Sequence, residues 1–159
     1  SFGEPMKEMF RGLAESARRY ALYEFLWPIH PNPEVRKALG AVAMPENVVI
    51  TEPLPYEAFA HCLASSAVTL TDSGGVVEEA VTLGVPAVIA RDKTERPEAV
   101  AAGRAILAGR SAKGILAALG TALAMKALRG DNGLPHYSTI FGDGHAAERI
   151  VSCLAERLS

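Results

Sequence analysis

The chain has 159 residues, of which 49% are hydrophobic and 21% charged, and its formal net charge at pH 7 is −2. This length suits one domain with a substantial core, and the composition excludes an intrinsically disordered chain. The 16 Lys and Arg residues against 18 Asp and Glu residues form no basic stripe, which argues against nucleic acid as a partner.

Targeting signals and cysteines indicate the compartment. No apolar run approaches the roughly 18 residues of a membrane span, and the first residues lack the cationic leader and apolar core of a signal peptide. We therefore expect a cytoplasmic protein that does not enter a membrane. Cys62 and Cys153 lie in apolar patterns without a Cys or His at metal-ligand spacing, so we expect two buried free thiols and no metal. The chain opens with Ser1 rather than Met, which hints at a cut chain.

Apolar periodicity predicts short strands that alternate with helices. In chain order we expect a helix over 5–19, a strand over 23–29, a helix over 33–39, a strand over 48–50, a helix over 56–65 and a strand over 67–71. A helix over 74–83, a strand over 87–90, a helix over 97–102, a strand over 105–107 and helices over 112–128 and 146–158 follow. This alternation predicts an α/β fold with a doubly wound parallel sheet.

The turn after the strand over 67–71 is the strongest candidate for a ligand site. Ser73, Gly74 and Gly75 lead directly into a helix, and ligands of open α/β sheets bind beyond the carboxyl ends of the strands. The first amides of a helix attract a phosphate, and glycines let it approach the main chain closely. The alternative is that Ser73 only caps the helix while the glycines make a turn.

A carboxylate one turn further supports a ligand with hydroxyl groups. Glu79 lies four residues after Gly75 and therefore on the same helical face. A carboxylate so near a phosphate is unfavourable unless it accepts hydrogen bonds from the ligand, such as those of a ribose diol. The competing interpretation is that Glu78 and Glu79 only complement the helix dipole.

Other loops lie at the same sheet edge. The charged segment 91–98 follows the strand over 87–90 and carries Arg96, and a guanidinium near a diphosphate is a recurrent arrangement. His30 ends the first strand, although a lone His is more often a loop residue than a ligand contact. The glycine turn over 141–145 is best explained as a rigid hinge.

Together these segments resemble the C-terminal domain of the non-hydrolysing UDP-N-acetylglucosamine 2-epimerases, which have a two-domain fold like the GT-B glycosyltransferases. The resemblance runs nearly from end to end of the chain. Its most specific part is Thr71-Asp72-Ser73-Gly74-Gly75 followed by Thr94-Glu95-Arg96-Pro97-Glu98, and its other parts are Phe2-Gly3-Glu4-Pro5, His30-Pro31-Asn32-Pro33, Glu52-Pro53-Leu54, Glu78-Glu79-Ala80, Leu83-Gly84-Val85-Pro86, Arg91-Asp92 and Gly142-Asp143-Gly144-His145. Residues 110–139 match only loosely, and Val77 stands where the family usually carries Gln.

The resemblance implies a role for each matching residue. Ser73, Gly74 and Gly75 would bind the diphosphate, Glu79 the ribose hydroxyls and Phe59 the uracil; Arg96 would lie by the phosphates, and His30 would be the cleft histidine that in some members helps bind a second nucleotide sugar.

The resemblance also implies the reaction. UDP-N-acetylglucosamine loses UDP and its C2 proton to give a 2-acetamidoglucal, and UDP adds back after protonation on the other face, which yields UDP-N-acetylmannosamine without a cofactor. The acid–base carboxylates belong to an N-terminal domain that is not in this sequence, so residues 1–159 would be a UDP-binding domain with no catalytic residue of their own. The full-length protein would form a homodimer. The first, central strand of the sheet would also be missing here.

Three alternatives remain at this stage. The chain could be the donor-binding domain of a GT-B glycosyltransferase, a module that binds UDP without chemistry, or part of a hydrolysing relative. The segment 94–98 favours the epimerase over the transferase.

Overall fold

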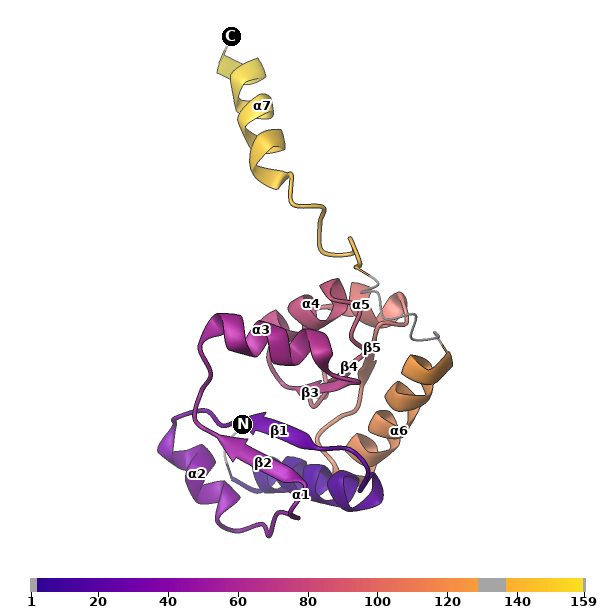
Figure 1. Cartoon of the computed structure of the whole chain (residues 1–159). Coiled ribbons are helices and arrows are strands. Elements are labelled where there is room, and N and C mark those ends of the chain that lie inside the picture. The colour runs from indigo at the N-terminus through magenta and orange to yellow at the C-terminus, as the bar shows by residue number, and fades with distance from the viewer. Residues whose placement is uncertain (1–2, 129–136, 159) are drawn as a thin grey trace.

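Parallel strands alternate with helices along residues 3–128 and 137–158, the part of the chain that the computed structural model describes (Figure 1). In chain order the first elements are α1 (Glu4–Arg19), β1 (Phe25–Pro28), α2 (Pro33–Leu39), β2 (Val48–Thr51), α3 (Tyr56–Ser65) and β3 (Thr69–Thr71). They are followed by α4 (Gly74–Thr82), β4 (Ala87–Ile89), α5 (Pro97–Ala101), β5 (Ala105–Leu107), α6 (Ala112–Leu128) and α7 (Ala146–Leu158). The predicted α/β class is confirmed.

The strands form two parallel sheets rather than one. β1 pairs with β2, and β3, β4 and β5 pair in that order. Placed end to end, β2-β1 and β3-β4-β5 match the doubly wound strand order 3-2-1-4-5-6 with position 1 empty. The described residues form no strand at this central position, as expected if the first strand is missing. Its absence explains why the sheet is divided.

The division leaves main-chain groups of β3 facing away from its partner strand. The amide of Thr69 donates to Pro86 O (3.0 Å), and Thr71 O accepts from the amide of Ala90 (2.9 Å). Because alternate residues of a parallel strand bond to opposite sides, the amide and carbonyl of Leu70 point to the unpaired edge.

Two apolar clusters hold the molecule together. One joins α3, α4 and α5 to β4 and β5, and it contains Leu63, Val77, Ala80, Val81, Val85, Ala87, Ile89, Ala99 and Ala105. The other, under the opposite face of β4, contains Val88, Ala90, Ile115, Ala118, Leu119 and Ala122. Every residue of β4 is buried, as expected for a strand covered on both faces. Helix α1 packs along α6 and also contacts α2.

Helix α7 differs from the other long helices because it extends away from the rest of the molecule (Figure 1). None of its described residues is buried, and Ile150, Val151, Leu154 and Leu158 form an exposed apolar stripe. The prediction of two buried thiols is therefore wrong for Cys153, which is exposed on a helix with no buried residue among those described. Cys62 in α3 is half-buried, and both thiols are free.

The strand boundaries also differ from the prediction. The strand expected over 23–29 spans only Phe25–Pro28, because the amide of Tyr23 closes a turn on Tyr20 O (2.9 Å). None of the described helices is long and apolar enough to cross a membrane.

Candidate functional site

The head of α4 presents unpaired amides to the sheet edge. The first intrahelical bond runs from the amide of Val77 to Ser73 O (3.2 Å), and no described residue accepts from the amides of Gly74 and Gly75. Ser73 is the N-cap residue, yet its side chain accepts no capping hydrogen bond. The Ser73 hydroxyl therefore does not cap α4 in this structure. The amides and the helix dipole give this point a positive potential that suits an anion.

The two glycines keep the head of α4 open. A β-carbon at Gly74 would have Glu95 Oε2 as its nearest neighbour, at 3.7 Å, and one at Gly75 would have Ser73 Oγ, at 3.9 Å. Both neighbours are side-chain atoms at ordinary contact distances. No main-chain atom or core side chain of the described residues therefore fills the space beside the two glycines. An anion could approach the amides to hydrogen-bond distance.

Glu79 carries a buried carboxylate oxygen without a partner. The side chain is half-buried, and Oε2 is shielded from solvent without a hydrogen bond from any described residue. An unsatisfied buried acceptor costs about 1–3 kcal/mol, and a hydroxyl donor from a ligand would remove that cost. Glu79 lies one turn after the open amides of α4. The structure thus brings an anion-attracting helix end and a carboxylate that needs a donor onto one helix.

The charged loop 91–98 is bound to α4 rather than freely solvated. Arg96 donates through Nε to Glu78 Oε1, and its Nη1 donates to Glu95 O (3.0 Å). Arg91 makes a two-pronged ion pair with Glu95, through Nη1–Oε2 (2.7 Å) and Nη2–Oε1 (2.8 Å). The Arg91 hydrogen bonds hold the pKa of Glu95 below its ordinary value, and Glu95 in turn raises the pKa of Arg91. The sequence analysis predicted neither the Arg96–Glu78 pair nor the Arg91–Glu95 pair, because no sequence motif specifies them.

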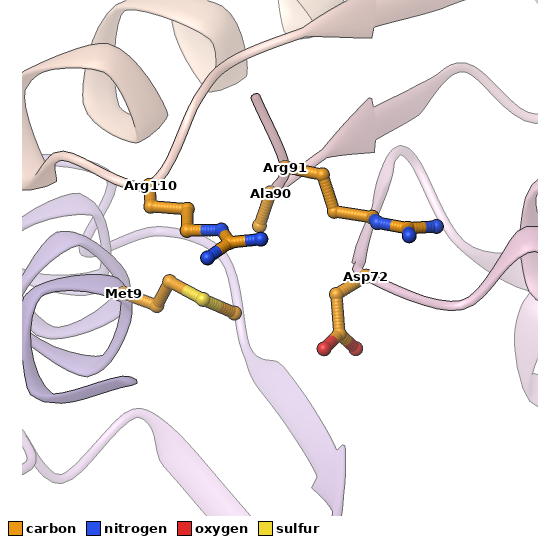
Figure 2. Close-up of a pocket in the computed structure, with 5 residues that line it drawn as sticks. All are labelled: Met9, Asp72, Ala90, Arg91 and Arg110. Carbon is orange, nitrogen blue, oxygen red and sulfur yellow. The ribbon is translucent and has the colours of Figure 1, made fainter. Parts of the chain in front are cut away.

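A polar cavity of about 210 Å³ opens where three strands end (Figure 2). Its lining comprises Met9 of α1, Asp72 after β3, Ala90 and Arg91 after β4, and Arg110 after β5. Arg110 Nε lies 3.4 Å from Asp92 Oδ2. Arg110 was not among the predicted site residues. Its position after β5 is the one signal that could have found it, because the carboxyl ends of parallel strands meet at one edge.

The remaining predicted residues lie on other elements. His30 follows β1, is exposed, and its Nδ1 accepts from the amide of Asn32 (3.2 Å). Phe59 of α3 is half-buried and packs against the apolar cluster that includes Val77 and Ala80 of α4. Among the described residues, the His30 side chain makes no hydrogen bond or ion pair with α4.

The glycine turn before α7 is tied down by ion pairs. Asp143 accepts from Arg149 Nη1 (2.8 Å) and Nη2 (2.5 Å) and from the amide of His145 (3.2 Å). Gly142 and Gly144 have φ values of 124° and 85°, which favour glycine. These contacts fit the hinge interpretation. Residues 3–128 and 137–158 contain no group of three His, Cys, Asp or Glu side chains that could hold a metal ion.

Comparison with known proteins identifies the family. The profile of the family described as UDP-N-acetylglucosamine 2-epimerase matches residues 1–155. The chain belongs to this family. Two similar members are the UDP-N-acetylglucosamine 2-epimerases of Yersinia pestis, 34% identical over 155 residues, and of Bacillus subtilis, 37% identical over 155 residues. The matches cover 97% and 95% of this chain but only 41% and 40% of those proteins.

A solved structure of the family has the same fold. The crystal structure of UDP-GlcNAc 2-epimerase from Neisseria meningitidis bound to UDP-GlcNAc matches with a TM-score of 0.84 and 34% sequence identity, over 98% of this chain and 42% of that one. The likeness is to the C-terminal domain of the GT-B-type fold of these epimerases. The chain thus spans about two fifths of the length of the epimerases it matches.

Proposed function

We propose that this chain binds the uridine diphosphate part of UDP-N-acetylglucosamine at the head of α4 and is the nucleotide-sugar half of a UDP-N-acetylglucosamine 2-epimerase. The observation that carries the proposal is the buried Oε2 of Glu79, which lacks a hydrogen-bond partner and lies one turn from the unpaired amides of Gly74 and Gly75. A nucleoside diphosphate offers an anion and a vicinal diol at this separation.

The diphosphate is bound by the amides of Gly74 and Gly75 and by the hydroxyl of Ser73. Amides fixed by the helix need no reorganisation to meet the phosphate oxygens, and the dipole of α4 adds to the attraction. The Ser73 hydroxyl is available because it caps nothing in the helix. Arg96, held beside α4 by Glu78, adds a positive charge near the same oxygens.

The ribose and the base extend from the diphosphate along the same side of the sheet edge. Glu79 accepts from the ribose 2′- and 3′-hydroxyls, which satisfies its buried oxygen. Phe59 lies against the uracil, and its main chain reads the edge of the base. His30 belongs to the cleft, where it helps to bind a second nucleotide sugar.

The role of this half in the reaction is to hold the leaving group. Elimination breaks the bond between C1 of the sugar and the diphosphate oxygen while a base removes the C2 proton, which leaves a 2-acetamidoglucal and UDP. Return of a proton to the opposite face of C2 and of UDP to C1 gives the epimer. An anchored UDP stays close enough to add back. The catalytic carboxylates belong to the other half of a longer polypeptide, which works in the cytoplasm as a homodimer.

Calorimetric titration with UDP tests the binding site. The 159-residue chain should bind UDP without turning over UDP-N-acetylglucosamine. Glu79→Ala should weaken binding about tenfold to a hundredfold, the range of a hydrogen bond to a charged group. Glu78→Ala is the matched control, because it removes the neighbouring carboxylate from the same helix. It also frees Arg96, which keeps its charge, so it should weaken binding much less than Glu79→Ala. Equal losses in the two variants would contradict the ribose assignment.

The chemistry is tested in the full-length protein. Incubation with UDP-N-acetylglucosamine in heavy water should place deuterium at C2 of the sugar, because the proton that returns comes from solvent. Transfer of the sugar to an acceptor without deuterium at C2 would instead indicate a glycosyltransferase, and release of free N-acetylmannosamine would indicate a hydrolysing enzyme.

A further inference from the structure

The carboxylate of Glu95 lies next to the head of α4. Glu95 Oε2 is the nearest atom to the position that a β-carbon of Gly74 would take, at 3.7 Å. Both oxygens of this carboxylate accept from the Arg91 guanidinium, at 2.7 and 2.8 Å. A negatively charged group with two oxygens, bound by a guanidinium, therefore lies beside Gly74 at the helix end that attracts an anion.

We propose that Glu95 occupies part of the diphosphate position and that ligand binding exchanges the Glu95 carboxylate for a phosphate on Arg91. Arg91 is then a further diphosphate-binding residue, and Glu95 is a gate that competes with the ligand. This inference rests on the proposed function, since it assumes that the diphosphate binds at Gly74 and Gly75.

The charges require this exchange. The carboxylate of Glu95 is ionised at neutral pH, because its pKa is already below the ordinary value, and it would repel a diphosphate bound at the amides of Gly74 and Gly75. Arg91 would keep its charge, and the forked guanidinium fits phosphate oxygens as well as it fits a carboxylate. Asp72 also lies near enough to raise the pKa of Arg91. Replacing Glu95 by phosphate thus keeps the guanidinium paired and removes the repulsion.

The exchange needs only a side-chain movement. The main chain on either side of Glu95 is held, because the Arg96 amide donates to Thr94 Oγ1 (3.0 Å), Arg96 Nη1 donates to Glu95 O (3.0 Å), and Arg96 is bound to Glu78 of α4. The side chains of Glu95 and Arg91 are 59% and 32% exposed. Water can therefore solvate the Glu95 carboxylate when it rotates away from Arg91. Ion pairs this exposed are weak, and a diphosphate with more charge displaces them.

Calorimetric titration of the 159-residue chain with UDP tests the exchange. Glu95→Gln should bind UDP about twofold to fivefold more tightly than the original chain, the range that corresponds to losing a weak, exposed competitor. Arg91→Ala should bind about tenfold more weakly, because a charge-assisted contact to phosphate is lost. In the Arg91→Ala background, Glu95→Gln should add less than a twofold change, because the carboxylate is no longer held over Gly74.

Glu98→Gln is the control for general charge. Glu98 is exposed in the first turn of α5, three residues after Glu95, and its substitution changes the net charge by the same amount without removing a partner of Arg91. It should leave UDP affinity within about twofold. If the original chain binds UDP but Glu95→Gln binds it no more tightly than Glu98→Gln, Glu95 does not compete with the ligand. The proposed function would then still stand. If neither the original chain nor any variant binds UDP, the proposed function fails and the gate fails with it.

Discussion

Gly12 in α1 lies so close to Ile115 in α6 that a β-carbon at position 12 would be 3.0 Å from Ile115 Cβ. The main chain of α6 is equally near, with Ala112 Cα at 3.1 Å. One turn further along α1, Ser16 is fully buried and its hydroxyl donates back to Gly12 O (2.7 Å). The contact between α1 and α6 therefore depends on a residue without a side chain.

Gly12→Ala should lower the free energy of unfolding by about 1–3 kcal/mol, because the added methyl overpacks this contact. Ala is intrinsically better than Gly in a helix by up to ~1 kcal/mol, so any net loss reports the clash. Urea unfolding measures it. Gly40→Ala is the control, because its β-carbon would meet Lys37 O at an ordinary 3.6 Å. Equal midpoints in the two variants would show that the helices are not in close contact.

The unpaired edge of β3 predicts a pattern of hydrogen exchange. The amide of Leu70 points away from β4, whereas the amide of Thr69 donates to Pro86 O. Leu70 should therefore exchange about a hundredfold faster than Thr69, as exposed edge amides do relative to those in a ladder. Exchange followed by NMR gives both rates in one sample. A protected Leu70 amide would mean that something in solution covers this edge.

The ion pair at the start of α7 predicts a pH-dependent helix end. Hydrogen bonds from Arg149 and from the His145 amide lower the pKa of Asp143 from its ordinary value. A lowered pKa means that the stabilisation is complete above the unfolded value and is lost as pH falls through the folded one. The first turn of α7 should therefore fray only below about pH 4. The substitution Arg149→Ala should return the pKa of Asp143 towards its ordinary value, and NMR titration of the Asp143 carboxyl measures this change. An unchanged pKa would contradict the ion pair with Arg149.

The apolar stripe of α7 predicts self-association of the 159-residue chain. Ile150, Val151, Leu154 and Leu158 are each more than half exposed, and exposed apolar patches of this kind favour association. Leu154→Lys should shift sedimentation velocity profiles towards the monomer. Ser152→Lys is the matched control, because it adds the same charge on the opposite face of the helix. An equal shift in both variants would attribute the effect to net charge.

Local signals in the sequence predicted most of the fold. Asn32 accepts from the amide of Glu34 (2.9 Å) and Pro33 opens α2, as the cap and proline rules require. Gly84 has a φ of 76° and ends α4 where the sequence indicated. Each of these features depends on residues within one turn, so spacing alone locates them.

Features that depend on distant partners were less predictable. The bond between Arg96 and Glu78 joins residues 18 positions apart, and no period of a helix or strand relates them. Cys153 follows an apolar helical pattern but is exposed. Such a pattern indicates which face of a helix can be buried, but it does not indicate which other element packs against that face. The head of α4 was found because glycines, amides and a carboxylate are all local to one helix, whereas Arg110 reaches the same edge only through the pairing of β4 with β5.

The divided sheet has a consequence for cooperativity. No ladder bond joins β1 and β2 to β3, β4 and β5 in the part of the chain described here, and α1, packed on α6 and on α2, bridges the two parts. A calorimetric scan of the 159-residue chain should therefore show a broadened or double transition, with a van't Hoff enthalpy below the calorimetric one. The lobe built on β1 and β2 should melt first, since it lacks a helix-covered central strand like β4.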